Sequence, residues 1–440
     1  MRFANSLAAV LLVGARVAHA TPEYIQSDQV APKSVEESVE SAEHAFKAPA
    51  PARVVSRIGE AFRKGALDLH LRNYYFHRYR DDSPDSETWA QGGALSYTTP
   101  WWRDRLRLDA TLYTSQKLYG PADEGGSMLL RPVQKSFSVP GQAALEARLY
   151  EGLLLKVYRQ TFTLPYLNAN DSRMVPNTFE SVTLGDLSGK RFVYGLVHTW
   201  RMKQRNADDF ISMTEAAGID GPKRAVSTAG ARYTFANGAN IGVVNHYCPD
   251  FMNIFYTEAN SRTRLMRGVG LQASAQFTRE GSVGDELGGD FDTYTWGAKL
   301  AASYAGLVLS LAHTATDDNA GIQSYWGGKP SYLSIMIEDF DSAGEDAWLL
   351  GLSSDFRIFG ANAFSGFINY ARGDTPDHGG NASPDEAEFD VTLDYKPETG
   401  LLKGLWFRLR GAFVDQDGSS GTDVRDIRFI VNYDFPILQQ

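Results

Sequence analysis

The sequence has almost no cysteine and no long hydrophobic run beyond its first residues. With Cys248 as the only cysteine among 440 residues, no disulfide can form within the chain. After residue 20 there is no stretch of about 18 uninterrupted apolar residues, which argues against a transmembrane helix. The net charge of −10 argues against nucleic acid as a general partner. Neither a disulfide scaffold nor a helical membrane protein is expected.

The motifs of common enzymes and metal sites are also missing. There is no Gly-x-Ser-x-Gly elbow, no His-Glu-x-x-His and no paired-cysteine site, and the eight histidines are scattered. Gly268-Val-Gly270-Leu-Gln-Ala273 lies inside an alternating segment rather than between a strand and a helix, so it does not indicate a dinucleotide loop. We therefore expect no enzyme activity, no cofactor and no metal site.

Two segments at the N-terminus differ from the rest of the chain. Residues 1–20 resemble a secretory signal peptide, with Arg2, an apolar stretch at Leu7–Gly14 and the cleavage triplet Ala18-His19-Ala20. Residues 21–62 form a polar tail, which we place in the periplasm. Apolar residues at helical spacing within it leave two alternatives: a flexible tail, or a partly helical one used for self-association or plugging.

From residue 63 to 440 the apolar residues recur with a period of two. In residues 404–414, Leu405, Phe407, Leu409 and Phe413 share one face, while Arg408 and Arg410 share the other. Alternation of this kind is typical of a membrane β-barrel with lipid outside and water inside, although composition alone also fits a soluble exported β-protein. Similar strands are expected at 67–71, 105–112, 145–150, 153–162, 191–201, 229–235, 239–247, 266–277, 294–304, 307–314, 332–337, 348–357, 364–371, 388–395 and 426–435.

The length of the alternating region predicts the number of strands. Spanning strands of about 9–11 residues with their connections take about 20 residues each, which predicts about 18 antiparallel strands. The fold class is thus all-β, a transmembrane antiparallel barrel with an N-terminal periplasmic segment. Aromatic girdles at the membrane interfaces are expected from Trp101-Trp102, Tyr325-Trp326 and Tyr433 with Phe435.

Several segments, in matching order, resemble the OprD (Occ) family of substrate-specific outer-membrane porins. They are Leu71-Arg-Asn-Tyr-Tyr-Phe-His-Arg78, Asn170-Asp-Ser-Arg-Met-Val-Pro-Asn-Thr-Phe179, Gly344-Glu-Asp-Ala-Trp348, Asn369-Tyr-Ala-Arg-Gly-Asp374, Leu402-Lys-Gly-Leu-Trp-Phe-Arg-Leu-Arg410 and Arg428-Phe-Ile-Val-Asn-Tyr-Asp-Phe435. The resemblance implies an 18-stranded barrel that admits small, carboxylate-bearing solutes past a narrow eyelet with a ladder of basic residues. The chain departs from the family pattern in three places. These are the long tail, a C-terminus without a final aromatic, and Asp85-Ser-Glu-Thr-Trp89 where the family usually has another arginine.

The resemblance also assigns residues to the pathway. Its basic ladder matches Arg78, Arg408, Arg410 and Arg428, and the period of two independently places the last three on the polar face. A guanidinium stays charged and can bind a carboxylate through two hydrogen bonds. Alternatively, these arginines are paired with wall carboxylates such as Asp426 or Asp434 and only stiffen the barrel.

Other pathway residues are expected in loops. An inward-folded constriction loop near 165–182 would carry Asp171, Ser172 and Arg173, and Arg372 is a further ladder candidate. Asp317 and Asp318 would supply an acidic wall opposite the ladder, or would simply be solvated.

These observations predict a porin in the outer membrane of a Gram-negative bacterium. Its permeants would be small organic acids or amino acids, and its surroundings would be outer-membrane lipid and lipopolysaccharide. A monomer or a loose trimer is expected. The alternatives are a porin for neutral oligosaccharides, like the chitoporins, and a structural barrel without transport.

Overall fold

The computed structural model describes residues 64–438, with gaps at 82, 151, 187–190, 266–267, 381 and 418–420. The predicted signal peptide and the predicted tail at 21–62 lie outside the described residues. Within the described part, no helix has both the length and the apolar character needed to span a bilayer.

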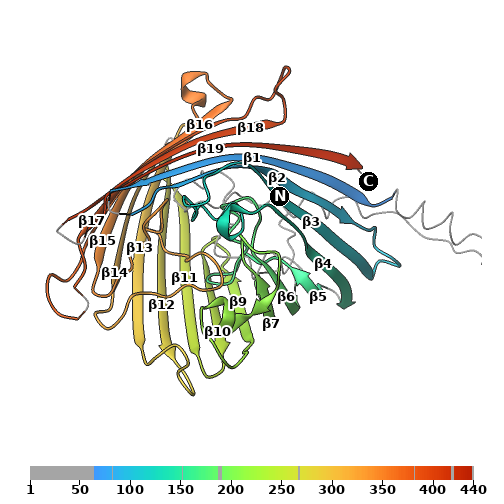
Figure 1. The fold of residues 1–440 in the computed structure, drawn as a ribbon, viewed down its shortest axis with the longest axis horizontal. Coiled ribbons are helices and arrows are strands. Elements are labelled where there is room, and N and C mark those ends of the chain that lie inside the picture. The colour runs from blue at the N-terminus through green and yellow to red at the C-terminus, as the bar shows by residue number, and fades with distance from the viewer. Residues whose placement is uncertain are drawn as a thin grey trace, which may run out of the picture.

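The described chain forms one antiparallel sheet of nineteen strands that closes on itself, because β1 pairs with both β2 and β19 (Figure 1). The strands are β1 (Ala66–Arg80), β2 (Ser86–Thr98), β3 (Leu106–Tyr119), β4 (Phe137–Tyr150), β5 (Leu153–Gln160), β6 (Thr178–Asp186), β7 (Phe192–Lys203), β8 (Ile211–Ser212), β9 (Val226–Thr234), β10 (Asn240–Cys248), β11 (Met252–Arg264), β12 (Gly270–Ser282), β13 (Asp292–Tyr304), β14 (Leu307–Thr316), β15 (Asp346–Ser354), β16 (Phe364–Asp374), β17 (Glu386–Tyr395), β18 (Leu405–Gln416) and β19 (Val424–Leu438). β8 has two residues and pairs only at the end of β7, which itself pairs with β9, so eighteen strands make the wall. The predicted 18-stranded barrel is confirmed.

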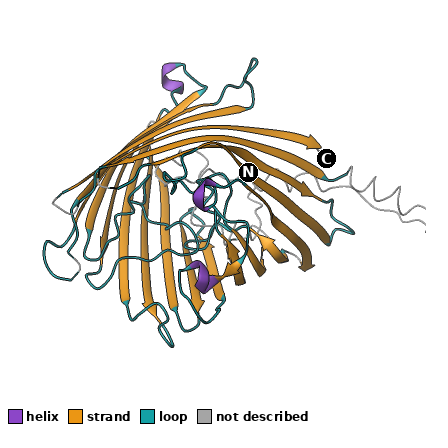
Figure 2. Ribbon diagram, in the orientation of Figure 1, coloured by secondary structure: helices purple, strands orange, loops and turns teal. Residues whose placement is uncertain are grey.

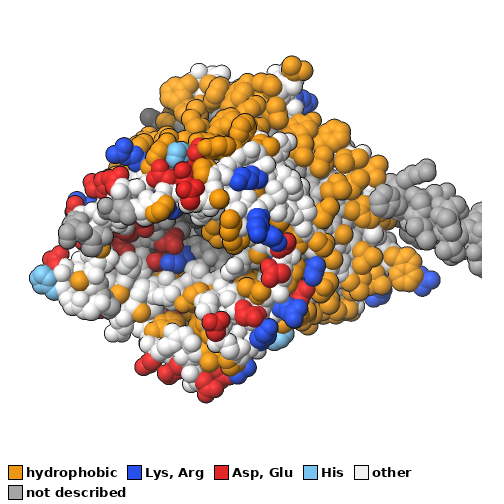
Figure 3. Space-filling view, viewed as in Figure 1, with side chains coloured by type: hydrophobic (Ala, Val, Ile, Leu, Met, Phe, Trp, Pro, Cys, Tyr) orange, Lys and Arg blue, Asp and Glu red, His pale blue; other side chains and the backbone are white. Residues whose placement is uncertain are grey.

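The two faces of the wall differ as the period of two predicts. On β18, Leu409 is 50% exposed on the outward face, whereas its neighbour Arg410 is 3% exposed on the inward face. On β19, Ile427 and Phe429 are likewise exposed and Arg428 is buried. Apolar side chains cover much of the outer surface in Figure 3, which suits contact with lipid.

The predicted strands were incomplete in places. β2, β6 and β11 were not predicted, and their sequences contain glycine, serine, threonine and glutamate at positions where a clear apolar alternation would be needed. The strand predicted at 332–337 was wrong, because these residues lie in the connection between β14 and β15. Its alternating apolar residues, including Leu333 and Ile335, are buried in a cluster inside the barrel.

The connections at the two ends of the barrel differ in length. Short turns lie at the end where β1 begins and β19 finishes, and this is the periplasmic end in outer-membrane barrels. The long connections at 120–136, 161–177, 204–225 and 317–345 lie at the other, extracellular end. Three short helical turns interrupt the connections: η2 (Pro132–Gln134), α4 (Met213–Ala216) and η4 (Arg357–Phe359) (Figure 2).

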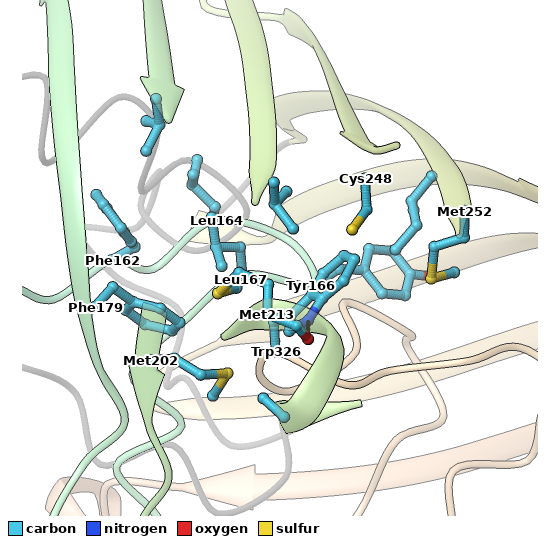
Figure 4. Packing of buried hydrophobic residues seen from close by; sticks show 14 of the residues in the cluster. Phe162, Leu164, Tyr166, Leu167, Phe179, Met202, Met213, Cys248, Met252 and Trp326 are labelled. Carbon is cyan, nitrogen blue, oxygen red and sulfur yellow. Dashed lines mark hydrogen bonds between the residues drawn. The ribbon is translucent and has the colours of Figure 1, made fainter. Parts of the chain in front are cut away.

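The long connections fold into the barrel and build its core. Figure 4 shows Phe162, Leu164, Tyr166 and Leu167 of connection 161–177 packed with Met213 and Trp326 from two other connections. The indole Nε1 of Trp326 donates to the carbonyl of Met213 over 2.9 Å. The predicted place of Trp326 in an aromatic girdle was therefore wrong. Tyr433 and Phe435, in contrast, lie on the outward face of β19 and stack with their ring centroids 6.2 Å apart.

Substitutions on the two faces of β18 test this assignment. We expect Leu409→Arg to destabilise the barrel by about 2–4 kcal/mol if position 409 lies near the bilayer midplane, because a charge would then face lipid. Arg410→Gln keeps the inward face polar and should fold almost normally. The measurement is denaturant unfolding in lipid vesicles, and normal stability of Leu409→Arg together with failure of Arg410→Gln would contradict the assignment.

Candidate functional site

Three arginines surround one buried ring inside the barrel. The guanidinium carbons of Arg78, Arg173 and Arg428 lie 5.5, 5.4 and 5.3 Å from the centre of the Phe76 ring. Arg78 comes from β1, Arg428 from β19 and Arg173 from connection 161–177, so the group joins the wall to the inward-folded loop. We call these three residues the Phe76 arginine cluster.

Asp426 is the carboxylate that two members of the cluster share. It accepts from Arg428 Nε at 2.7 Å and Nη2 at 3.1 Å, and from Arg78 Nε at 2.8 Å. Arg428 also donates through Nη2 to the carbonyl of Met336 over 3.2 Å. The terminal nitrogens Nη1 and Nη2 of Arg78 have no hydrogen bond within the described part of the chain. Arg78 therefore holds its position through Nε, while its two terminal nitrogens have no acceptor among the described residues.

The inward connection 161–177, predicted to be a constriction loop, is held to β1 by a further ion pair. Arg72 donates to both carboxylate oxygens of Asp171, at 2.9 and 3.2 Å, and also contacts the carbonyl of Arg173. Arg173 in turn donates to the carbonyls of Ser127 at 2.9 Å and Ser172 at 3.0 Å. The loop residues predicted for the pathway thus do meet the first strand. The loop itself occupies 161–177, and residues 178–182 of the predicted range belong to β6.

Arg205 joins this group although the sequence did not indicate it. It lies just beyond β7, donates to Asn170 Oδ1 over 3.3 Å and contacts Ser172 Oγ. No carboxylate of the described residues lies within ion-pair distance of it. Burial, together with the charges of Arg173 and Arg428, lowers the pKa of Arg205 to about 9. Because it follows the end of a strand, the period of two could not have placed it.

Two further arginines that were predicted for the ladder lie on β18. Arg408 binds Asp394 through Nε at 2.8 Å and Nη2 at 3.0 Å, and its guanidinium lies 4.6 Å from the Trp406 ring. Arg410 donates through Nε to Thr392 Oγ1 over 3.0 Å. Both side chains point inward, as predicted, and both donate hydrogen bonds to side chains of the neighbouring strand β17.

The remaining predicted residues lie elsewhere. Arg372 is 44% exposed and shares the outward face of β16 with Ile368 and Tyr370, so its predicted position on the lumen is corrected. The alternation of apolar residues had not been used to decide whether Arg372 faces the lumen or the outside of the barrel. Asp317 accepts from the backbone of Asn319 in a turn at the start of connection 317–345, and Asp318 beside it is exposed.

Carboxylates not predicted from the sequence lie deeper in that connection. Lys329 binds Asp341 at 2.7 Å and Asp339 at 3.4 Å. Burial raises the pKa of Asp341 to about 6 and that of Glu345 to about 7. Figure 3 shows a hollow whose surroundings carry both acidic and basic side chains. Among the described residues, no group of three or more His, Cys, Asp or Glu is placed to hold a metal ion.

The Arg72–Asp171 pair generates a prediction about the loop. We expect Asp171→Asn to destabilise the inward loop conformation by about 1–3 kcal/mol, because Arg72 is buried and loses a charged partner. The loop should become easier to cleave by protease, and open-channel current should become noisier. Asp317→Asn in the exposed turn is the control, and identical behaviour of the two variants would contradict the pairing role.

The raised carboxyl pKa values generate a prediction about pH. Between pH 8 and pH 5, Glu345 and then Asp341 should lose their charge, whereas the guanidinium groups keep theirs. Because a raised folded-state pKa favours the protonated form, the inward loop also gains stability as the pH falls through this range. The anion-over-cation permeability ratio, measured by reversal potential, should therefore rise on acidification, and less so in Asp341→Asn. A ratio independent of pH would contradict this.

Comparison with known proteins agrees with this geometry. The sequence model of the family described as "outer membrane porin, OprD family" matches residues 61–437. Porin D of Pseudomonas aeruginosa is 24% identical over 413 residues, which cover 85% of this chain and 91% of that protein.

Solved structures show the same fold. P. aeruginosa OccK9 (OpdG) superposes with a TM-score of 0.77 at 23% identity, covering 86% of this chain and 100% of the other. P. aeruginosa OpdK, solved with vanillate, gives 0.76 at 22% identity, covering 85% and 99%. A BenF-like porin from Pseudomonas fluorescens Pf-5 gives 0.77 at 20% identity, covering 86% and 100%. The chain belongs to the OprD family of porins, channel proteins of the Gram-negative outer membrane.

Proposed function

We propose that this porin mediates selective passive uptake of small carboxylate-bearing solutes, such as organic acids or amino acids, through a lumen lined by an arginine ladder. The observation that carries the proposal is the Phe76 arginine cluster, in which Arg78 keeps two donors beside Arg428 and Arg173. A guanidinium is planar and stays charged, so the terminal nitrogens of Arg78 offer an incoming carboxylate two neighbouring donors.

Pairing with wall carboxylates and transport are compatible roles. Asp426 and Asp394 hold Arg78, Arg428 and Arg408 in place, which weakens the attraction that each arginine exerts on a solute. A channel needs this weakening, because each site must release its ion to the next. The salt bridges were predicted as an alternative to transport. In this proposal they hold the arginines rigid and keep the binding of a solute at each arginine weak.

The relatives support this class of solute. OpdK was solved with vanillate, which is an aromatic carboxylate, and it shares the fold with this chain. A porin for neutral oligosaccharides would need exposed aromatic rings along the pathway. Here Phe162, Tyr166, Phe179 and Trp326 are buried in the hydrophobic cluster that the inward loops form with the wall, which favours the carboxylate proposal over the sugar alternative.

Neutralising Arg78 tests the proposal. We expect Arg78→Gln to lower the uptake of benzoate into liposomes by about tenfold, because a charged hydrogen-bond donor is lost, while benzamide uptake changes little. Arg279→Gln is the matched control, since that arginine lies on the outward face of β12 in an exposed pair with Asp292. Equal loss of benzoate and benzamide uptake would mean that Arg78 only supports the wall.

A further inference from the structure

An aromatic ring in contact with two arginines lies at the periplasmic mouth of the barrel. Trp101 belongs to the turn 99–105 between β2 and β3, and the guanidinium carbons of Arg107 and Arg148 lie 4.7 and 3.8 Å from the centre of its ring. Arg107 is the second residue of β3, and Arg148 is the third residue from the end of β4, so both lie close to the periplasmic edge. We call these three residues the mouth cluster.

The register of β3 and β4 places both arginines on the inward face. Arg107 stands opposite Glu146, which is 4% exposed, whereas Leu108 beside it is 55% exposed on the outward face. Arg148 has the same parity on β4 as Glu146, so it also faces inward. Trp101 touches both guanidinium groups and therefore lies on the inner side of the mouth. The aromatic girdle predicted for this residue was wrong.

The carboxylates in this part of the wall hold the neighbouring cations. Glu146 accepts from Arg107 Nε at 2.8 Å and lies 2.7 Å from its Nη2. Asp109 accepts from Lys156 Nζ over 3.2 Å and lies 3.9 Å from Arg107 Nε. Arg107 is thereby fixed beside the Trp101 ring by a carboxylate of the adjacent strand.

Arg148 is held differently, because only its ring contact fixes the guanidinium. Its side chain makes no hydrogen bond to another described residue, and Glu146 and Asp104 attract it from beyond ion-pair distance. Among the described residues, none of its nitrogens is both buried and unpaired, so the donors without a protein acceptor face water. A guanidinium that stacks on an indole keeps its edge available, and that edge can bind a carboxylate through two parallel hydrogen bonds.

The mouth cluster repeats the arrangement of the Phe76 arginine cluster. In each cluster a ring lies beside several guanidinium groups, and a wall carboxylate holds one of the arginines. In each, another arginine has terminal donors without an acceptor among the described residues, namely Arg78 in the first cluster and Arg148 in the second. Arg78 lies near the extracellular end of β1, so a solute that leaves it still has to pass the periplasmic mouth.

We propose that the mouth cluster is a carboxylate-binding station at the periplasmic exit, where Arg148 binds the solute while Trp101 and Arg107 position Arg148. A partly exposed guanidinium binds an anion weakly, which allows the station to release its solute into the periplasm. A solute that enters from the periplasmic side meets this station first. This inference rests on the proposed carboxylate function and deepens it.

The test measures block of single-channel current by benzoate that is added to one chamber at a time. We expect Arg148→Gln to raise the half-blocking concentration about fivefold for one chamber only, which is the effect of losing one partly exposed ion pair. Arg78→Gln should raise it mainly for the opposite chamber, because Arg78 lies nearer the other end of the barrel. Arg148→Lys keeps the charge and should stay within about twofold of the wild type.

Two controls accompany these variants. Arg279→Gln on the outward face should leave block from both chambers unchanged, because Arg279 is in an exposed pair with Asp292. Faster migration of unboiled protein on gels verifies that each barrel has folded.

The outcomes separate this inference from the proposed function. Equal effects of Arg148→Gln on the two chambers, or no effect on either, would overturn the station while leaving a selective effect of Arg78→Gln intact. Failure of Arg148→Lys to the same extent as Arg148→Gln would also overturn it, because Arg148 would then act by packing against Trp101. If Arg78→Gln affects uptake of benzoate and benzamide equally, the carboxylate function fails and the station fails with it.

Discussion

The shared ion pairing at Asp426 is the interaction on which the interior of this barrel depends. A barrel in lipid keeps charged side chains near the bilayer midplane on its inward face, where they are crowded and partly buried. Asp426 holds Arg78 and Arg428 at once, and Arg428 then reaches the carbonyl of Met336 in the long inward connection. A single carboxylate thereby orients two inward arginines and, through Arg428, contacts a loop.

The inward connections turn this wall into a selective channel. Arg72 and Asp171 fasten connection 161–177 to β1, and Tyr332 and Met336 carry connection 317–345 from the β11 side to the β19 side. These loops also share a hydrophobic cluster around Trp326, so the side chains of one loop pack against those of the others. The interior of this barrel is thus shaped by loops that are held by wall residues.

The sequence predicted the wall well and the loops poorly, for physical reasons. A period of two is a local property, so the inward position of Arg408, Arg410 and Arg428 and the outward position of Leu409 were predictable from neighbours along the strand. Strands rich in glycine or hydroxyl residues, such as β2, carry no such signal. Arg205, Trp326 and the segment 332–337 depend on contacts between distant parts of the chain, and no local pattern specifies those. Arg372 was misplaced because no facing was derived for its strand.

Block of single-channel current by added solute distinguishes recognition of a carboxylate by its charge from recognition by its shape. Wild-type protein in a planar bilayer carries a chloride current, to which benzoate or benzamide is added at increasing concentration. Recognition by charge predicts saturable, concentration-dependent block by benzoate and almost none by benzamide, which has the same shape without the charge. Equal block by the two solutes, or block by benzamide alone, would contradict it.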